Sequence, residues 1–417
     1  MIGSELPKGW KLVPLKEITS IIRGVSYPKE EAKLHPEENY VHILRGGNIQ
    51  DGKIVFETDD NVYVNSSLVG EEQFVLKDDV VIVASTGSKK VIGKAATIEE
   101  DSRCISFGAF LLLLRTNVID KRFHSYFFQT QYYRNTISSL AGGININNIK
   151  KEHIENLQIP LPPLTEQKQI AEKLDKLFDQ IETIKEASNK IPELLKNFRQ
   201  QVLTYAVTGK LIESTPEPRM LGELIDELKY GTSKKADYDI EGFPVLRIPN
   251  INNGEIDSSD LKYLPLDDKE YNQLALQEGD ILVIRSNGSL SIVGQCAIVR
   301  KECENWVYAG YLIRIRCTHE LLPEYLNYIF QSYQVRKQIV EKSHSMSGVN
   351  NFSADKIKQL EIAWYPVEVQ KQIVEKLNSI FGKLNEIEKQ YNTLCEKLDK
   401  LPQTLLCKAF KGELVYD

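Results

Sequence analysis

The chain has 417 residues, of which 42% are hydrophobic and 26% are charged, and its formal net charge is −6. This length exceeds one ordinary domain core, so at least two domains are expected, and the composition is typical of a soluble globular protein. No apolar run approaches the roughly 20 residues of a membrane-spanning helix, and the N-terminal sequence lacks the pattern of a secretory signal, so we expect a cytoplasmic protein without membrane contact.

The sequence predicts a series of short elements that occurs twice along the chain. The series begins with an extended segment leading into a short helix, continues with a strand and a hairpin turn, and then has a buried strand, a polar glycine turn and a returning strand. Helical segments rich in aromatic residues follow, and their spacing favours packing in a core over stacking on a ligand. In chain order the paired segments are 9–18 and 219–225, 44–54 and 246–256, 79–93 and 280–294, and 126–133 and 325–333.

Each series ends in a long helical segment with a heptad repeat. Residues 166–212 align without a gap with residues 369–415, which lie 203 positions later. Apolar residues recur at steps of four and three in both segments, so we expect two long helices that pack their apolar seams together and leave only their outer faces for partner proteins. The seam residues are Ile170, Leu174, Leu177, Ile181, Ile184, Ile191, Leu195, Phe198 and Val202 in the first segment, and Ile373, Leu377, Ile380, Leu384, Ile387, Leu394, Leu398, Leu401 and Leu405 in the second.

Two prolines fall inside these helical segments, Pro192 in the first and Pro402 in the second. Because both seams keep their register beyond the proline, we expect kinks within continuous helices. The alternative is that each proline begins a separate short helix.

The internal repeat defines the predicted domain organisation. A period this long indicates a duplicated domain, and we divide the chain into two globular domains, residues 1–162 and 213–365, each followed by a helical region, residues 163–212 and 366–417. The predicted fold class is α+β: two α/β domains with a pseudo-two-fold relation, separated by two long antiparallel helices that form a coiled coil. At about 1.5 Å per residue, helices of roughly 43 residues would extend about 65 Å and hold the domains apart.

The sequence contains no catalytic or metal-binding pattern. Residues 87–95 resemble a phosphate-binding loop, but five residues separate the two glycines and Ala95 stands where the motif needs a hydroxyl. The six histidines and six cysteines show no spacing typical of metal ligands, and the cysteines are expected to be reduced thiols. We therefore predict a non-catalytic protein without a metal or a cofactor.

Polar residues in the predicted turns are the best candidates for contact with a nucleic acid. Hydroxyls and backbone N–H groups bind phosphates, Arg can fork onto guanine, and Asn onto adenine; the alternative is that these groups only hydrogen-bond their own turn. For Arg45 and Arg247 the alternative is a structural ion pair, and for the Asn pairs at 147–148 and 350–351 it is helix capping or turn formation. The candidate DNA-binding residues are Arg45, Asn48, Ser85, Thr86, Gly87, Ser88, Lys89, Lys90, Asn145 and Asn147 in the first repeat, and Arg247, Asn250, Arg285, Ser286, Asn287, Gly288, Ser289 and Asn350 in the second.

The start of the first helical region carries a family resemblance. Residues 161–175 read Leu-Pro-Pro-Leu-Thr-Glu-Gln-Lys-Gln-Ile-Ala-Glu-Lys-Leu-Asp, and with the Thr-Gly-Lys-Leu of residues 208–211 they resemble the conserved region of Type I restriction–modification specificity subunits. Both copies and the order of domains and helices fit, so the resemblance covers nearly the whole chain. The second copy departs from the pattern, because residues 361–366 replace the Leu-Pro-Pro approach.

The resemblance implies a protein that reads a bipartite double-stranded DNA target, with one half-site for each target-recognition domain, while the helices set the length of the unread gap. It further implies that the chain recruits two methyltransferase subunits and, through them, two translocating endonuclease subunits, and holds no S-adenosylmethionine itself. The alternatives are a structural adaptor scaffold that does not bind DNA, and an orphan specificity subunit of a modification-only complex.

The distribution of charge bears on how tightly such a chain would bind DNA. Residues 1–162 carry a net charge of −1 and residues 213–365 a net charge of −6, so the release of counterions from DNA would supply little affinity. We expect the isolated chain to bind DNA weakly and its methyltransferase partners to provide most of the phosphate contacts.

Overall fold

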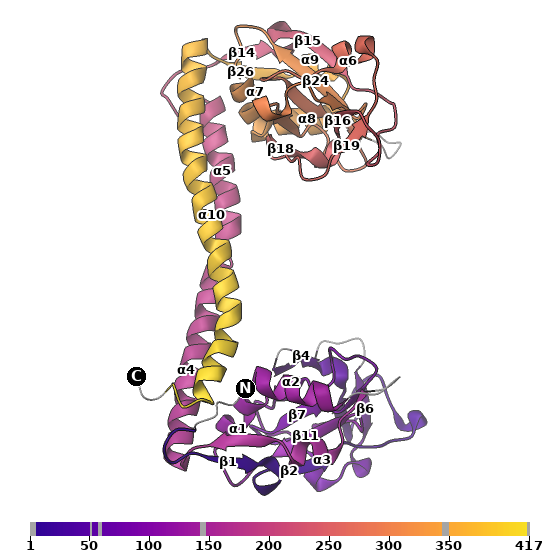
Figure 1. Cartoon of the computed structure of the whole chain (residues 1–417), viewed down its shortest axis with the longest axis vertical. Helices are drawn as coiled ribbons and strands as arrows, with labels where there is room; N and C mark the ends of the chain where they lie inside the picture. Colours follow the sequence, from indigo (N-terminus) through magenta and orange to yellow (C-terminus); the bar gives the residue numbers. More distant parts are fainter. Residues whose placement is uncertain (1–5, 51, 57–60, 142–146, 344–349, 415–417) are drawn as a thin grey trace. The chain divides into compact units, whose positions relative to one another are not determined.

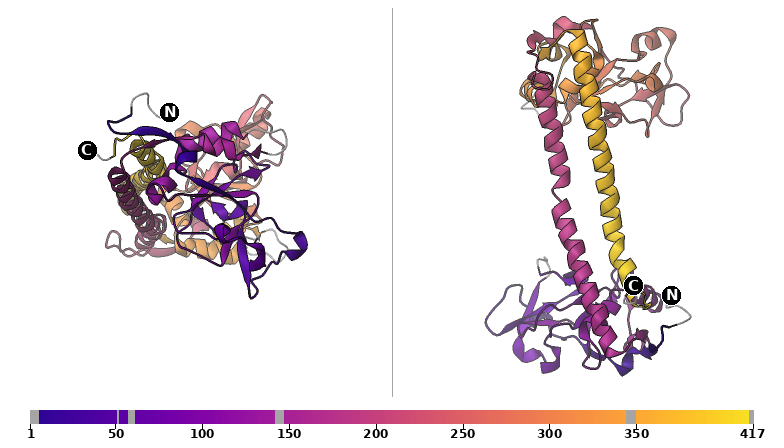
Figure 2. Two further views of the ribbon diagram at one scale, coloured as in Figure 1. Left: turned by 90° about the horizontal axis from the view of Figure 1, so that it is seen from below. Right: turned by 90° about the vertical axis from the view of Figure 1, so that its left-hand side faces the viewer.

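The computed structural model describes residues 6–50, 52–56, 61–141, 147–343 and 350–414. The chain divides into two compact units. The first unit comprises Met1–Ser188 and Thr393–Asp417, and the second comprises Asn189–Asn392. Each unit contains one globular domain and portions of the long helices, and each is described separately (Figures 1 and 2).

The globular part of the first unit is built on a four-stranded sheet with the order β2-β11-β7-β9 and a three-stranded sheet with the order β10-β3-β6. Short two-stranded pairs, β1 with β13, β4 with β5 and β8 with β12, complete it. The strands are β1 (Lys11–Pro14), β2 (Ser20–Arg23), β3 (Tyr40–Leu44), β4 (Ile49–Gln50), β5 (Lys53–Ile54), β6 (Val62–Asn65), β7 (Val80–Val83), β8 (Ser85–Thr86), β9 (Ala95–Thr97), β10 (Ile105–Phe107), β11 (Leu111–Arg115), β12 (Asn147–Asn148) and β13 (Gln158–Leu161). The helices are α1 (Lys121–Phe127), α2 (Gln131–Leu140), α3 (Lys151–Glu155) and α4 (Leu164–Ser188).

The central strands are apolar on both faces because both faces of the four-stranded sheet are covered. Val80 and Leu112 pack with the aromatic residues of α1 and α2, whereas Val81 and Leu113 pack in a second cluster with Ile49. Successive side chains of a strand point to opposite faces. This double burial explains why β7 and β11 have continuous runs of Val, Ile and Leu in place of an alternating pattern.

The second unit repeats this topology strand for strand. Its four-stranded sheet has the order β15-β24-β20-β22 and its three-stranded sheet the order β19-β16-β23, so the predicted duplication of an α/β domain is confirmed. The strands are β14 (Glu217–Met220), β15 (Ile225–Tyr230), β16 (Phe243–Leu246), β17 (Ile251–Asn252), β18 (Glu255–Ile256), β19 (Lys262–Leu264), β20 (Ile281–Ile284), β21 (Ser286–Asn287), β22 (Cys296–Ile298), β23 (Val307–Tyr308), β24 (Leu312–Cys317), β25 (Asn350–Asn351) and β26 (Glu361–Trp364). The helices are α5 (Ile191–Val207), α6 (Asp268–Leu274), α7 (Pro323–Phe330), α8 (Tyr333–Ser343), α9 (Ala354–Lys358) and α10 (Val367–Ala409), whose last turns belong to the first unit.

The aromatic helical segments pack in the cores, as their spacing predicts. Phe123, Phe127 and Tyr133 are fully buried in the first unit, and Tyr325 in the second. Tyr333 is the exception, because 65% of its surface is exposed at the start of α8.

The two prolines in the helical regions have different effects. The prediction of a kink is wrong for Pro192: α4 ends at Ser188, and Pro192 lies in the first turn of the separate helix α5. Proline is tolerated there because the first backbone N–H groups of a helix have no intrahelical acceptor. The helix α10 instead continues through Pro402 for all of its 43 residues.

The helices pack antiparallel within each unit, as predicted. In the first unit the Lys185 ammonium contacts the Asp399 carboxylate at 2.8 Å, and in the second the Arg199 guanidinium donates to the Asn385 amide oxygen at 2.7 Å. The prediction that the seams are used up internally is right only in part. Seam residues near the middle of the helices are 38–48% exposed: Ile184, Phe198, Ile387, Leu394 and Leu401.

One buried glutamine fastens the start of each long helix to its globular domain. Gln167 accepts a hydrogen bond from the backbone N of Asp120 at 2.9 Å and donates to the carbonyl of Pro162 at 2.8 Å. Gln370 accepts from Leu322 N at 2.8 Å and donates to two carbonyls, of Glu320 at 2.8 Å and Tyr365 at 2.7 Å. The glutamine in the repeated motif is therefore structural.

Replacement of Gln370 by leucine should destabilise the second unit by about 3 kcal/mol. The substitution leaves the backbone N–H of Leu322 and the carbonyl of Tyr365 without a partner, whereas the Glu320 carbonyl still accepts from the indole N–H of Trp364 at 3.1 Å. Each unsatisfied buried group costs about 1–3 kcal/mol before any relaxation. The measurement is urea unfolding of the full chain, with Gln372→Leu as the matched control because Gln372 is exposed on the same helix. Equal midpoints for the two variants would contradict the structural role.

Candidate nucleic-acid interface

The first glycine turn follows the end of β7, and an arginine anchors its backbone by hydrogen bonds. Ser85 and Thr86 are half-buried in β8, and the residues from Gly87 to Lys90 are exposed. The Arg134 guanidinium donates to the carbonyls of Ile92 at 2.6 Å and Lys90 at 3.2 Å. The turn thus presents three hydroxyls and two ammonium groups from a fixed backbone.

The equivalent turn of the second unit is anchored in the same way. The Arg336 guanidinium donates to the carbonyls of Val293 at 2.9 Å and Ser291 at 3.1 Å. Within the turn, the Asn287 amide oxygen accepts from the backbone N of Ser289 at 2.9 Å, so this side chain satisfies its own turn. The Arg285 guanidinium lies 4.8 Å from the centre of the Tyr230 ring.

The asparagine pairs at 147–148 and 350–351 are neither helix caps nor turn formers. They form the short strands β12 and β25, which pair with the glycine turns. Asn350 donates to the carbonyl of Gly288 at 3.0 Å, and Asn147 donates to the carbonyls of Thr86 and Gly87 at 3.4 Å. Both are buried, with 7% and 4% exposure respectively, so we remove them from the DNA-contact set. The candidate Asn145 lies outside the described residues.

Asn48 and Asn250 are also structural. Each is 1% exposed and accepts a hydrogen bond from the backbone N of the arginine three residues before it, Arg45 or Arg247, at 2.8 Å. Their amide NH₂ groups donate to nearby loop carbonyls, that of Val55 at 2.9 Å in the first unit and those of Asp257 and Asp260 at 2.8 Å in the second. With 1% exposure, neither Asn48 nor Asn250 offers an accessible surface to DNA in this structure, and we do not propose them as contacts.

The predicted ion-pair alternative is confirmed for Arg247. Its guanidinium contacts the Asp260 carboxylate at 2.9 Å. Hydrogen bonds from Tyr238 and Arg247 lower the pKa of Asp260, so the pair stays charged at neutral pH.

A groove in the first unit brings several candidate residues together although they are far apart in the sequence. It has a volume of about 610 Å³, and it is lined by the ends of β3 and β7 and by the loop between β10 and β11. Lys29 and Arg45 supply its positive charge. The side chains that concern DNA binding are Tyr27, Lys29, Arg45, Ser85, Thr86 and Phe110.

The structure reveals two exposed aromatic residues that the sequence analysis missed. Phe110 is 65% exposed at the edge of this groove, and Tyr311 is 62% exposed at the equivalent position of the second unit. An internal alignment of residues 107–111 with 308–312 contains the signal, since Phe-Gly-Ala-Phe-Leu matches Tyr-Ala-Gly-Tyr-Leu.

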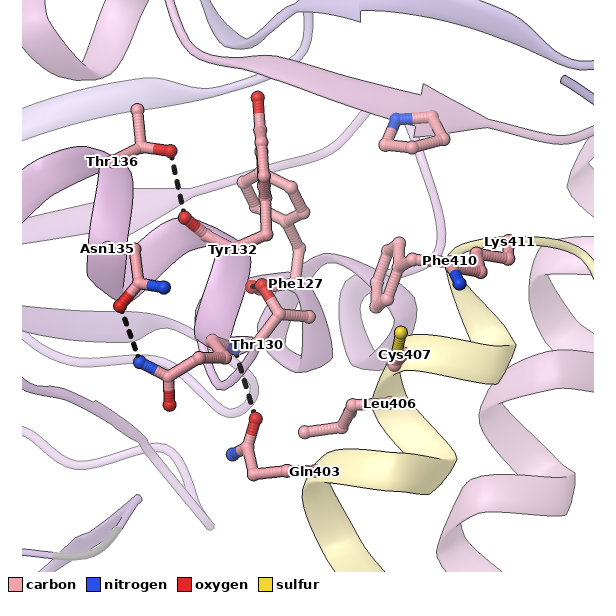
Figure 3. Close-up of a pocket in the computed structure, with 12 residues that line it drawn as sticks. Phe127, Thr130, Tyr132, Asn135, Thr136, Gln403, Leu406, Cys407, Phe410 and Lys411 are labelled. Atoms are coloured by element: carbon pink, nitrogen blue, oxygen red, sulfur yellow. Dashed lines mark hydrogen bonds between the residues drawn. The ribbon is translucent and has the colours of Figure 1, made fainter. Parts of the chain in front are cut away.

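A second groove of the first unit is a poorer site for nucleic acid. It lies between α2 and the last turns of α10 and has a volume of about 360 Å³ (Figure 3). Its lining includes Phe127, Tyr132 and Phe410, and Lys411 is the single cationic side chain among the described residues that line it. The Gln403 side chain spans one side of the groove, where its amide oxygen accepts from Gln131 N at 3.0 Å (Figure 3).

Two further properties concern the described parts of the chain as a whole. In these parts, no group of three or more His, Cys, Asp or Glu side chains is arranged to hold a metal ion. None of the helices described has the length and apolar character that crossing a membrane requires.

Comparisons with known proteins identify the family. The model of the Type I restriction modification DNA specificity domain matches residues 7–193 and again 214–397. The chain is 40% identical to the EcoKI specificity subunit of Escherichia coli strain K12 and 36% identical to the StySPI specificity subunit of Salmonella potsdam, both Type I restriction enzymes. Each alignment covers 99% of this chain and 91% of the relative.

Solved structures share the fold. An HsdS subunit from Thermoanaerobacter tengcongensis superimposes with a TM-score of 0.68 at 18% identity, covering 98% of both chains. A chain from a study of complex assembly in the Type I restriction–modification system gives a TM-score of 0.73 at 19% identity, covering 99% of this chain and all of the other. The fold is that of a duplicated DNA specificity protein, and the chain belongs to the Type I restriction–modification specificity subunit family.

Proposed function

We propose that the chain is the DNA-recognition subunit of a Type I restriction–modification complex and reads a bipartite, gapped target. One observation carries the proposal: the chain contains two copies of one domain, each with an exposed, anchored glycine turn beside a loop that exposes an aromatic residue. Two half-sites require two DNA-recognition domains. The turns differ in sequence, Ser-Thr-Gly-Ser in the first domain and Ser-Asn-Gly-Ser in the second, and this difference fits two different half-site sequences.

The proposed contact residues are those that the structure leaves accessible near the turns. In the first target-recognition domain (residues 1–162) and the second (residues 213–365), hydroxyls and cations suit phosphates and base edges. The set is Arg45, Ser85, Thr86, Gly87, Ser88, Lys89 and Lys90 in the first domain, and Arg285, Ser286, Asn287, Gly288 and Ser289 in the second.

The helical regions, residues 163–212 and 366–417, are proposed to set the gap and to dock two methyltransferase subunits. Their mid-helix apolar side chains support docking, since Phe198 is 48% exposed and Ile387 46% exposed on long amphipathic helices. Partly exposed apolar side chains along these helices favour a protein partner. The endonuclease subunits would join through the methyltransferases, and all chemistry would be theirs, in the cytoplasm, with no cofactor held by this chain.

The methylated sequence itself is the decisive measurement. When the chain is expressed with its methyltransferase in a host lacking other modification systems, we expect methylation at a motif of two short specified parts separated by several unread base pairs. Single-molecule sequencing of the host DNA detects it. Methylation at a continuous short palindrome, or none that depends on this chain, would contradict the proposal and favour the adaptor alternative.

A further inference from the structure

Both globular domains expose one aromatic side chain at the same point of the fold, beside the glycine turn. Phe110 is 65% exposed and Tyr311 62%. Each lies in the loop that enters the second strand of the four-stranded sheet, β11 or β24. The carbonyl of Phe110 accepts from Ser85 N at 3.1 Å, and that of Tyr311 from Arg285 N at 2.9 Å. The aromatic loop and the glycine turn are therefore coupled by backbone hydrogen bonds in both domains.

The same hydrogen bonds fix the backbone of the aromatic loop in the two domains, although the small residues of the loop differ in order. The end of the neighbouring strand approaches the loop closely: a Cβ on Gly24 would lie 2.1 Å from the carbonyl O of Gly108, and one on Gly231 would lie 2.3 Å from that of Ala309. The equivalent bonds are Ala109 N to Val25 O at 3.0 Å and Gly310 N to Thr232 O at 2.6 Å, and Leu111 N to Gly108 O at 2.8 Å and Leu312 N to Ala309 O at 2.9 Å. The exposed ring is thus presented from a rigid support.

The polar surroundings of the ring suit a nucleic acid. In the first domain Phe110 shares its groove with Lys29, Arg45, Ser85 and Thr86. Cations and hydroxyls bind phosphates. The bases of a duplex already stack on one another, so an exposed apolar ring in the same groove contacts the face of a base by inserting at a base step, as apolar side chains do in proteins that bend DNA. A ring held on a fixed loop also loses little conformational entropy when it binds.

We propose that Phe110 and Tyr311 stack on a base of the half-site that their own domain reads. The inference rests on the proposed function and adds the base contact that the hydroxyls and cations do not supply. Loss of a single aromatic–base stack lowers affinity by roughly ten- to hundredfold. In the first domain Lys29 and Arg45 can hold the DNA backbone whatever its sequence. The ring inserts only where the domain is seated on its half-site, so its loss is expected to weaken binding to the specific target.

The experiment uses the complex of the chain with its methyltransferase and a duplex that carries the methylated motif, with a scrambled duplex for comparison. We expect Phe110→Ala and Tyr311→Ala each to bind the motif roughly ten- to hundredfold more weakly, with unchanged affinity for the scrambled duplex. Phe110→Trp and Tyr311→Phe should bind within about threefold of the parent, since they keep a ring. The matched control is Tyr333→Ala, because Tyr333 is 65% exposed in the second domain but lies on α8.

A fluorescence scan assigns the contact to a half-site. With 2-aminopurine in place of each adenine of the motif in turn, on either strand, binding of the parent should change the fluorescence at an adenine in each half that contacts the ring or lies next to it. Phe110→Ala should remove the change in one half only, and Tyr311→Ala in the other half only.

The outcomes separate the inference from the proposed function. If the parent complex does not distinguish the motif from the scrambled duplex, the proposed function fails. If it does distinguish them, and the alanine variants bind the motif as tightly as the parent or lose equal affinity for both duplexes, stacking is overturned while the function stands. A loss confined to one variant overturns stacking for the other domain.

Discussion

Replacement of Asp280 by alanine is expected to destabilise the second unit by about 3–5 kcal/mol, the cost of removing one partner from a buried ion-pair network. The Asp280 side chain is 2% exposed, and its carboxylate contacts the Arg316 guanidinium at 2.8 Å. It also lies 3.9 Å from the guanidinium of Arg314, whose side chain is 2% exposed. Without Asp280, Arg314 keeps only one ion-pair partner in the described structure, Glu227 at 2.7 Å.

The first unit supplies a matched comparison for this substitution. Asp79 forms the equivalent pair with Arg115 at 2.6 Å, but the buried strand position of Arg314 is occupied there by Leu113. Asp79→Ala should therefore cost less, on the order of 1–3 kcal/mol, because only one arginine loses its carboxylate there, and the Arg115 guanidinium keeps hydrogen bonds to the carbonyls of Glu72 and Phe74.

Chemical denaturation followed by tryptophan fluorescence measures both effects in the full chain. Trp10 lies in the first unit, and Trp306 and Trp364 lie in the second, so a Trp10→Phe background reports on the second unit alone. The double variant Asp280→Ala, Arg314→Leu should recover part of the loss, since it also removes the buried guanidinium that has lost one of its two carboxylate neighbours. If Asp79→Ala and Asp280→Ala were equally destabilising, the argument from the buried Arg314 would be wrong.

The duplicated topology could be predicted from the sequence because its signals are local and occur twice. Strand-turn-strand segments such as 79–93 and the heptad seams depend on residue patterns within one segment, and a repeat confirms each pattern with its copy. The structure agrees with the predicted strand-turn-strand segments, whereas the first helical region divides near Pro192 and the middle of the seams is partly exposed. The sequence also offers a structural ion pair as the alternative role of Arg247, and the structure contains this pair, with Asp260.

The grouping of the site residues could not be predicted because it depends on strand order. Arg45 and Phe110 meet Ser85 in one groove only because β3 pairs with β10 and β7 pairs with β11. The asparagines show a second reason why the site could not be predicted: residues that were expected to be accessible are buried. Polar residues near a turn look accessible in a sequence, yet Asn48 is buried because the loop carbonyl of Val55 and the backbone N of Arg45 need its amide group.

The sequence pattern also did not decide whether the first helical region forms one continuous helix or two separate helices. The apolar register continues across Pro192, so a continuous helix and two helices bury similar side chains. The chain takes the second solution, with α4 ending at Ser188 and α5 beginning at Ile191. This junction is the natural place to change the length of the helical region without disturbing either globular domain.

Insertion of one heptad between Lys185 and Lys190 is expected to change the length of the unread gap or to abolish recognition, while both half-site sequences stay the same. Seven helical residues add about 10.5 Å, which is about three base pairs of DNA. A full heptad keeps the apolar seam on the same face of the helix. With α10 unchanged, however, the contacts of Lys185 with Asp399 and of Arg199 with Asn385 cannot both be kept, which is why loss of recognition is one of the expected results.

A second insertion of seven residues in α10, after Asn392 where the two units divide, should restore the equal length of the two helical regions. The paired variant is then expected to methylate the same two half-sites at a gap longer by about three base pairs. Each added base pair also rotates one half-site around the DNA axis relative to the other, so the preferred gap is expected to be the one that brings both half-sites to face their domains. The motif is read by sequencing methylated host DNA, and Glu186→Ala is the control, since it alters the same exposed segment without changing its length. If either insertion changed the half-site sequences and left the gap as it was, the helices would not set the spacing, and the globular domains would have to determine the gap themselves.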